Sequence, residues 1–277
     1  FAVASVFSAG IPVVNPWRET LAGSIDIFAM KLNPTCDEIL YATYLGGDGS
    51  DMPYGIDVCA DGSLLIAGDT GGGEFPLVNP PQDWEAEGIL IKLSPTGDEL
   101  LISTMIGGHE DDYTRALAVA AGPDGSAYVS GWTATEDFPI VNAIQPEFNG
   151  PRSGFLVKIP PDGGLYEFAT YYGNGAFYIE AICLGPGGDI FLGGYMGGGF
   201  DVVKPYQYSY AGGDDFVIAR LSPDAQSVRY ATYLGGGSND KLLGMDVTDE
   251  GVVYVGGDTL SNDFPVKNGY QMSYHGT

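Results

Sequence analysis

The chain has 277 residues, and its 36 acidic against 11 basic side chains give a formal net charge of −25. This charge argues against nucleic acid as a partner, because phosphate backbones are bound by clustered Lys and Arg side chains. No apolar run approaches the roughly 20 residues that a membrane-spanning helix needs, so we expect no membrane insertion. The excess of carboxylates suits divalent cations or a basic protein partner.

The first residues, FAVASVF, have the pattern of a strand and lie in the register of a repeat that follows. We interpret residues 1–25 as a partial repeat, followed by full repeats over residues 26–87, 88–153, 154–214 and 215–277 of a single domain. Three sets of equivalent positions define this register. They are Gly62, Gly125, Gly188 and Gly251; Lys31, Lys92, Lys158 and Arg220; and Thr43, Thr104, Thr170 and Thr232.

Each full repeat is predicted to form four β-strands. Asp61 and Gly62 supply a tight turn between the first two strands, and glycine permits the positive φ that such a turn needs. Pro95 begins the turn between the last two, where proline stops strand continuation. In the clearest repeat the expected strands cover residues 55–58, 64–68, 89–93 and 100–106.

The third strands are apolar on both faces. Phe28 and Met30 lie on one face of the first of them, and Ile27 and Ala29 lie on the other. A sheet with one solvated face would alternate apolar with polar residues, so these sheets are expected to be covered on both sides. The repeat of about 63 residues with glycine-rich turns is typical of a radial β array. We therefore predict an all-β protein, a β-propeller of four-stranded antiparallel blades.

The repeat pattern also resembles a known family. D-x-F-x-x-K-L-x-P-x-G is followed by Y-x-T-Y-L-G-G, G-I-x-V-x-x-x-G, Y-V-x-G-x-T and D-F-P, which is similar to the SBBP-type bacterial β-propeller repeat. The resemblance covers the whole chain and departs most at Asn174, which replaces a glycine, and at Asp201-Val202, which replace Phe-Pro. It implies a propeller on an exported bacterial protein, in an extracellular, cell-surface or periplasmic location, and it implies no uniform activity.

The strand types are not equally represented. The second strand occurs five times, starting with residues 1–7, while the other three types occur four times each. We favour a segment of a larger propeller of about six to eight blades. We expect both ends to be completed by other protein, from the same polypeptide or a neighbouring copy, because open sheet edges invite unwanted pairing. In the alternative, residues 26–45 pair with the hairpin 242–257 and close a four-bladed ring.

Polar loops follow the fourth strands, and their carboxylates and amides at short spacing suit Ca²⁺, which takes six to eight oxygen ligands. In the competing interpretation, Gly and Asp only build a turn, and no loop matches the full D-x-[DN]-x-[DN]-G calcium pattern. The candidate ligands are Asp48, Asp51, Glu110, Asp111, Asp112, Asn239 and Asp240.

Other candidates have simpler structural explanations. Asp57 and Asp246 lie near the ends of first strands and are candidates for ligand contact or for solvated channel lining. The Phe-Pro pairs are more typical of loop pinning than of peptide binding. Alternating tyrosines offer rings that can stack on sugars or pack over a blade edge. The aromatic candidates are Phe75, Phe138 and Phe264; Tyr206, Tyr208 and Tyr210; and Trp17, Trp84 and Trp132.

Catalysis has little support from the sequence. The chain has two histidines, His109 and His275, and no G-x-S-x-G, Cys-His or H-E-x-x-H arrangement. The three cysteines, Cys36, Cys59 and Cys183, have no metal-ligand spacing and are expected to be thiols, with one disulfide as the alternative. We predict a non-enzymatic structural and interaction module that presents the loops after Asn15, Asn79, Asn142 and Lys204 to a protein partner or a neighbouring subunit. The alternative is a Ca²⁺-dependent carbohydrate-binding or carbohydrate-cleaving propeller.

Overall fold

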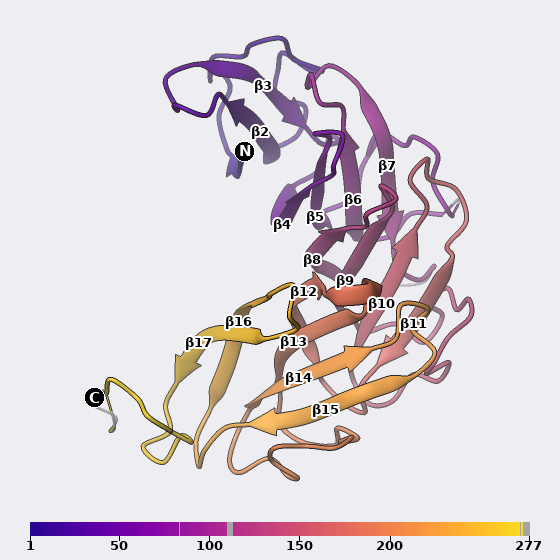
Figure 1. Ribbon diagram of the computed structural model, residues 1–277. Coiled ribbons are helices and arrows are strands. Elements are labelled where there is room, and N and C mark those ends of the chain that lie inside the picture. The colour runs from indigo at the N-terminus through magenta and orange to yellow at the C-terminus, as the bar shows by residue number, and fades with distance from the viewer. Residues whose placement is uncertain (83, 110–112, 272, 274–277) are drawn as a thin grey trace. The chain divides into compact units, whose positions relative to one another are not determined.

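The computed structural model describes residues 1–82, 84–109, 113–271 and 273, and their regular structure is almost entirely β-strand (Figure 1). One 3₁₀ turn, Pro186–Gly188, is the only helical element in these residues. The first sheet contains β1 (Ala2–Val6), β2 (Asp26–Leu32) and β3 (Ile39–Leu45). The second contains β4 (Asp51–Val58), β5 (Leu64–Thr70), β6 (Gly88–Leu93) and β7 (Leu100–Ile106).

The remaining strands form three further sheets. The third sheet contains β8 (Thr114–Ala121), β9 (Ala127–Thr133), β10 (Ser153–Ile159) and β11 (Phe168–Tyr172). The fourth contains β12 (Tyr178–Leu184), β13 (Ile190–Met196), β14 (Asp215–Leu221) and β15 (Val228–Leu234). The fifth contains β16 (Asp240–Val247) and β17 (Val253–Thr259). The predicted all-β class and the four-stranded antiparallel sheets are therefore confirmed.

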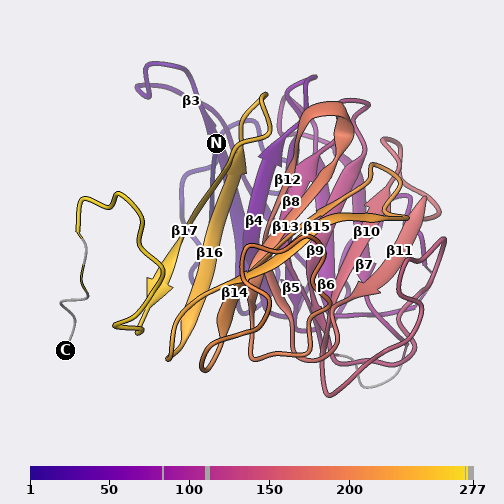
Figure 2. The same cartoon turned by 60° about the horizontal axis from the view of Figure 1, so that its bottom comes forward.

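The chain separates into two compact units, which we describe one at a time. Unit 1 comprises Phe1–Val129, Thr135–Pro139 and Val157–Glu167, and unit 2 comprises Ser130–Ala134, Ile140–Leu156 and Phe168–Thr277. In unit 1, β4 contacts β1 and β2, and β8 contacts both β4 and β5. In unit 2, β16 contacts β12, β13 and β14 (Figure 2). Successive repeats thus pack sheet on sheet within each unit.

Both faces of β2 are buried in apolar clusters, as the sequence predicted. Ile27 and Ala29 pack with Ile66 and Ile91 of the second sheet. Phe28 packs on the opposite face with Tyr44, Val6 and residues of the connecting loop. Because burial of apolar area is the main favourable contribution to folding, this double-sided burial ties each sheet to its neighbours.

The threonines of the repeat register fasten the long loop between the second and third strands. The hydroxyl oxygens of Thr43, Thr170 and Thr232 each accept a hydrogen bond from a loop N–H at 3.0 Å, donated by Arg18, Gln145 and Gln207 respectively. All three threonines are buried. Without these bonds, the loop amides would lie unpaired against the sheet, which is costly.

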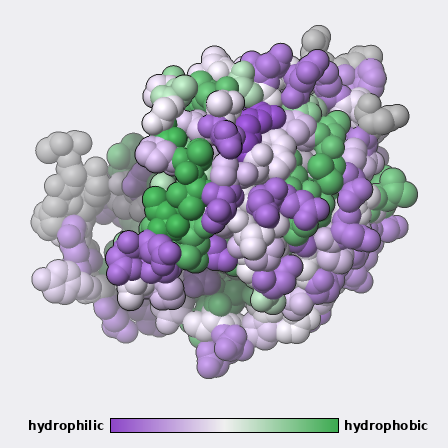
Figure 3. All heavy atoms as spheres, turned by 90° about the horizontal axis from the view of Figure 1, so that it is seen from above, coloured by the Kyte–Doolittle hydropathy of each residue, from purple (hydrophilic) through white to green (hydrophobic). Residues whose placement is uncertain are grey.

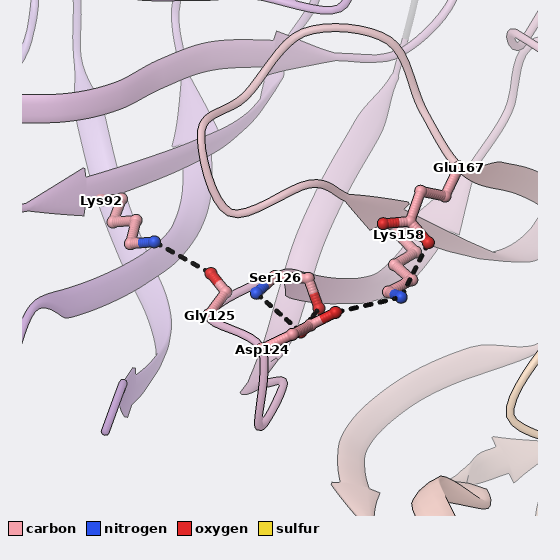
Figure 4. Close-up of polar contacts among 6 residues, drawn as sticks. All are labelled: Lys92, Asp124, Gly125, Ser126, Lys158 and Glu167. Atoms are coloured by element: carbon pink, nitrogen blue, oxygen red, sulfur yellow. Dashed lines mark hydrogen bonds and ion pairs between the residues drawn. The ribbon is translucent and has the colours of Figure 1, made fainter. Parts of the chain in front are cut away.

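Two lysines of the register, Lys31 and Lys92, link one sheet to the next in unit 1. Lys31 Nζ donates to the carbonyl of Pro95 at 3.0 Å. Lys92 Nζ donates to the carbonyls of Gly125, at 2.9 Å, and Pro161, at 2.8 Å; the first of these bonds is drawn in Figure 4. Each of these two lysines therefore bonds to turns of the following sheet.

The first and last sheets have three and two strands within the described residues. β1 pairs with β2 along its whole length, and the other edge of β2 pairs with β3. Both edges of β2 are therefore occupied, so β2 does not pair with the hairpin at 242–257 as the four-bladed alternative requires. Completion of these sheets by other protein stays a prediction.

Candidate binding surfaces

The first acidic loop holds two of the predicted calcium ligands, and both accept bonds from backbone amides. Asp48 is exposed, and its Oδ1 accepts from the N–H of Glu74 at 2.8 Å. Asp51 was expected in the loop but begins β4, where it is buried and its Oδ2 accepts from Gly47 N–H at 2.8 Å. Burial raises the pKa of the Asp51 carboxyl, and the neighbouring charge of Asp26 adds to this effect.

The equivalent residues in unit 2 bond in the same manner. Asn239 Oδ1 accepts from the N–H of Asp214 at 3.1 Å. Asp240 begins β16, is buried, and its Oδ2 accepts from Gly236 N–H at 2.7 Å and from the Ser261 hydroxyl at 2.8 Å. These contacts favour the turn-building interpretation for the ligands that the structure describes.

The remaining predicted ligands, Glu110, Asp111 and Asp112, lie outside the described residues. Within the described part of the chain, no three His, Cys, Asp or Glu side chains come together in a way that could hold a metal ion. Calcium binding stays a prediction for these loops.

Asp57 and Asp246, the two aspartates near the ends of first strands, differ in their bonding partners. Asp57 Oδ2 accepts from the N–H of Ala121 at 2.7 Å, so it joins the end of β4 to the end of β8 in unit 1. Asp246 is exposed on β16, and its Oδ1 accepts from the next backbone N–H, that of Val247, at 2.8 Å. Asp57 thus links two strands, whereas Asp246 is exposed to solvent; its place in a channel stays a prediction.

The Phe-Pro elements pin their loops, as predicted. Phe75 and Phe138 are buried. Phe264 packs edge-on against Phe216 with 5.5 Å between the ring centroids. The rings of Phe75 and Phe138 are therefore not available for peptide binding unless their loops move, whereas Phe264 is half-buried.

The loops proposed to meet a partner share a backbone conformation that sequence patterns alone did not reveal. Asn15, Asn79, Asn142 and Lys204 all have positive φ, between 43° and 49°. The valine before each of them forms an isolated bridge to the fourth strand of the same sheet, such as Val14 to Ala42. Each loop therefore covers an outer sheet edge, which protects it from pairing with another chain. The available signal was a recurring Val-Asn pair, Val-Lys in the fourth loop, followed three positions later by Gln or Arg.

The tyrosine stripe in unit 2 lies on one of these loops and faces solvent. Tyr206 is 68% exposed, Tyr208 78% and Tyr210 46%. The backbone N–H of Tyr206 is held by the Thr232 hydroxyl at 2.9 Å. These rings therefore stand on a fixed backbone, and packing over the sheet edge does not bury them. Of the tryptophans, Trp132 is buried with the Arg152 guanidinium 4.4 Å from its ring centroid.

A cleft of about 400 Å³ in unit 1 was not foreseen from the sequence. The rings of Trp84 and His109 lie 6.2 Å apart beside it, and the Trp84 indole N–H donates to the carbonyl of Gly107 at 3.2 Å. Glu85 and Tyr113 add an exposed carboxylate and a phenol. The Trp-Glu-Ala-Glu segment at 84–87 was the overlooked signal. The lining residues are Gly71, Gly72, Glu85, Ala86, Glu87, His109 and Tyr113.

All three cysteines are free thiols, so the disulfide alternative is wrong for this structure.

No protein-family model matches the chain, and no curated protein matches it. No helix among the described residues is long and apolar enough to cross a membrane. Apolar and hydrophilic areas adjoin one another on the face seen in Figure 3, without a clean separation.

Proposed function

We propose that this chain is a non-enzymatic structural and interaction module, built as part of a β-propeller and carried by an extracellular, cell-surface or periplasmic bacterial protein. The repeated sheet-on-sheet packing and the double-sided burial of β2 support the propeller. The location rests on the resemblance of the repeat alone. The net charge of −25 favours a protein partner with a basic surface.

The exposed tyrosine stripe carries this proposal. Tyr206 and Tyr208 are mostly exposed on a loop whose backbone is bonded to a buried threonine. Exposed aromatic rings on a rigid support are typical of protein-binding sites, because they bury a large area with little loss of conformational entropy. Asp214, near the end of the same loop, adds negative charge.

The test uses crosslinking of the purified chain on the surface of bacterial cells, followed by identification of the captured protein and a calorimetric measurement with that protein. The variant Tyr206→Ala/Tyr208→Ala/Tyr210→Ala is expected to weaken binding at least tenfold, which is the size of effect seen at binding hot spots. The control is Tyr270→Ala, which removes an exposed tyrosine from a different loop. Equal binding by the triple variant and the wild type would exclude the stripe as the contact surface.

The cleft beside His109 supports a second candidate, carbohydrate binding with or without calcium. An aromatic pair beside carboxylates can stack on a sugar ring and accept hydrogen bonds from its hydroxyl groups. The predicted calcium ligands Glu110, Asp111 and Asp112 directly follow His109 in the sequence.

A glycan array probed with CaCl₂ and with EDTA tests this candidate. We expect signals that Trp84→Ala abolishes and that Trp17→Ala, a change at a different tryptophan of unit 1, leaves unchanged. Loss of signal in EDTA would assign calcium to the site, and a featureless array under both conditions would remove the candidate.

A further inference from the structure

A second cavity lies wholly in unit 2, where the repeat departs from its own pattern. It has a volume of about 230 Å³. Asn174 and Asp201, two of the positions at which this repeat departs from the pattern, both line it. Its walls are formed by Ile144, Gln145, Tyr172, Gly173, Asn174, Phe200, Asp201, Val203 and Val228.

The regular repeats leave little room for a side chain at the position of Asn174. In them this position is glycine, and the Phe-Pro loop lies directly on it. A Cβ atom at Gly236 would be 2.5 Å from Asp263 Oδ1 and 3.0 Å from the backbone nitrogen of Phe264. At Gly47 it would be 2.9 Å from the backbone nitrogen of Phe75. A larger side chain therefore cannot share this space with the loop in its usual place.

The repeat over residues 154–214 accommodates the Asn174 side chain through changes in this loop. Counted back from the bridged valine, Phe200 holds the same place as Phe75 and Phe138. The departures are Gly199 and Asp201, which stand where the regular loops have an acidic residue and proline, so the prediction that Asp201-Val202 replaces Phe-Pro is off by one residue. Asn174 Nδ2 now donates to Asp201 Oδ2 at 3.1 Å, and Asn149 Nδ2 donates to Asn174 Oδ1 at 3.1 Å. The changes at 174 and 201 are thus coupled by a hydrogen bond, and the cavity occurs beside them.

The walls of the cavity divide into an apolar end and a polar end. Phe200 is buried and packs edge-on against Tyr172, with ring centroids 5.6 Å apart, and the aliphatic side chains extend this apolar surface. The Asp201 carboxylate provides negative charge and has no ion pair within the described residues. Burial raises the pKa of the Tyr172 hydroxyl, and the Asp201 charge contributes, so the phenol stays neutral.

We propose that this cavity binds a small organic cation with an apolar body, such as a primary ammonium group attached to a ring or short alkyl chain. Its ammonium group lies against Asp201, and its apolar part lies against Phe200 and Val228. The net charge of −25 attracts cations and disfavours anions. A volume below that of pockets for drug-sized ligands limits the occupant to a small molecule. None of the stripe tyrosines and none of the residues that line the His109 cleft lines this cavity.

Benzylammonium, benzyl alcohol and benzoate form a suitable series of probes, because they share a ring and differ in charge. Calorimetry and saturation-transfer NMR at millimolar ligand should detect benzylammonium, with affinity at least tenfold above that of the alcohol and no binding of benzoate. Asp201→Asn should weaken benzylammonium binding at least tenfold. Asp249→Asn removes the same charge from an exposed turn and should change the affinity less than twofold.

A second variant tests whether the altered repeat creates the site. Asn174→Gly combined with Asp201→Pro restores the regular residues at both positions and should abolish binding, with folding checked by thermal melting. The proposal is overturned by equal affinity for the alcohol, by equal effects of the Asp201 and Asp249 changes, or by binding that survives in the restored variant. Absence of any benzylammonium signal with the wild-type chain would overturn it as well.

Discussion

Lys92 and Lys158 occupy the same position in two successive repeats, yet their ammonium groups have different kinds of partner (Figure 4). Lys92 is 4% exposed and donates to the carbonyls of Gly125 and Pro161. Lys158 lies 2.7 Å from Glu167 and 3.6 Å from Asp124, which are partly exposed carboxylates. A repeated basic residue can thus be held by backbone dipoles or by ion pairs, depending on the turns that surround it.

Replacing Lys92 is expected to have the larger effect. Lys92→Met removes two charge-assisted hydrogen bonds and leaves two turn carbonyls without their donor, which should lower the free energy of unfolding by about 3 kcal/mol. Urea unfolding at neutral pH measures this. Lys267→Met, at an exposed site, controls for the loss of a cation from an acidic chain. A loss no larger than that of the control would contradict a structural role for the Lys92 bonds.

Replacing Lys158 should cost less, about 1 kcal/mol, because the carboxylates of Glu167 and Asp124 can regain water when the ammonium group is removed. A double-mutant cycle of Lys158→Met with Glu167→Gln isolates the ion pair. Its coupling energy should shrink in 1 M NaCl, since salt screens partly exposed charges. A coupling energy that is unchanged by salt would mean that Lys158 is held as Lys92 is.

The sequence was sufficient to predict the strands, the turn glycines and the register of the lysines, because these depend on local conformation and on spacing. Gly62, for example, has φ of 86°, as its tight turn requires. The partners of the lysines were not predictable, since Pro161 lies 69 residues from Lys92 in the chain. Which turn it meets depends on how the sheets pack.

The candidate sites were harder to predict for the same reason. Asp51 and Asp240 looked like loop ligands, but they begin strands and are buried, because the first strand of each repeat starts earlier than its apolar pattern suggested. The cleft beside His109 combines Gly71 with Tyr113, which are distant in sequence. The departures at Asn174 and Asp201 were visible in the sequence, but the hydrogen bond between them and the adjoining cavity required the fold.

The smallest expected effect is a difference in pH dependence between the stabilisation at the Lys158 site and that at the Lys92 site. The Ser126 hydroxyl and N–H donate to Asp124, and with the nearby Lys158 they hold the pKa of this carboxyl below its usual value. A carboxyl whose folded pKa is lowered stabilises the protein above its unfolded pKa, and this contribution is lost as the pH falls through the folded value. The destabilisation caused by Asp124→Asn should therefore be complete near neutral pH and diminish below about pH 4. The destabilisation caused by Lys92→Met should persist over the same range, because carbonyl groups do not titrate. Urea unfolding of both variants between about pH 7 and about pH 3 makes the comparison, and parallel curves would show that the two lysines do not differ in the way their charge is held.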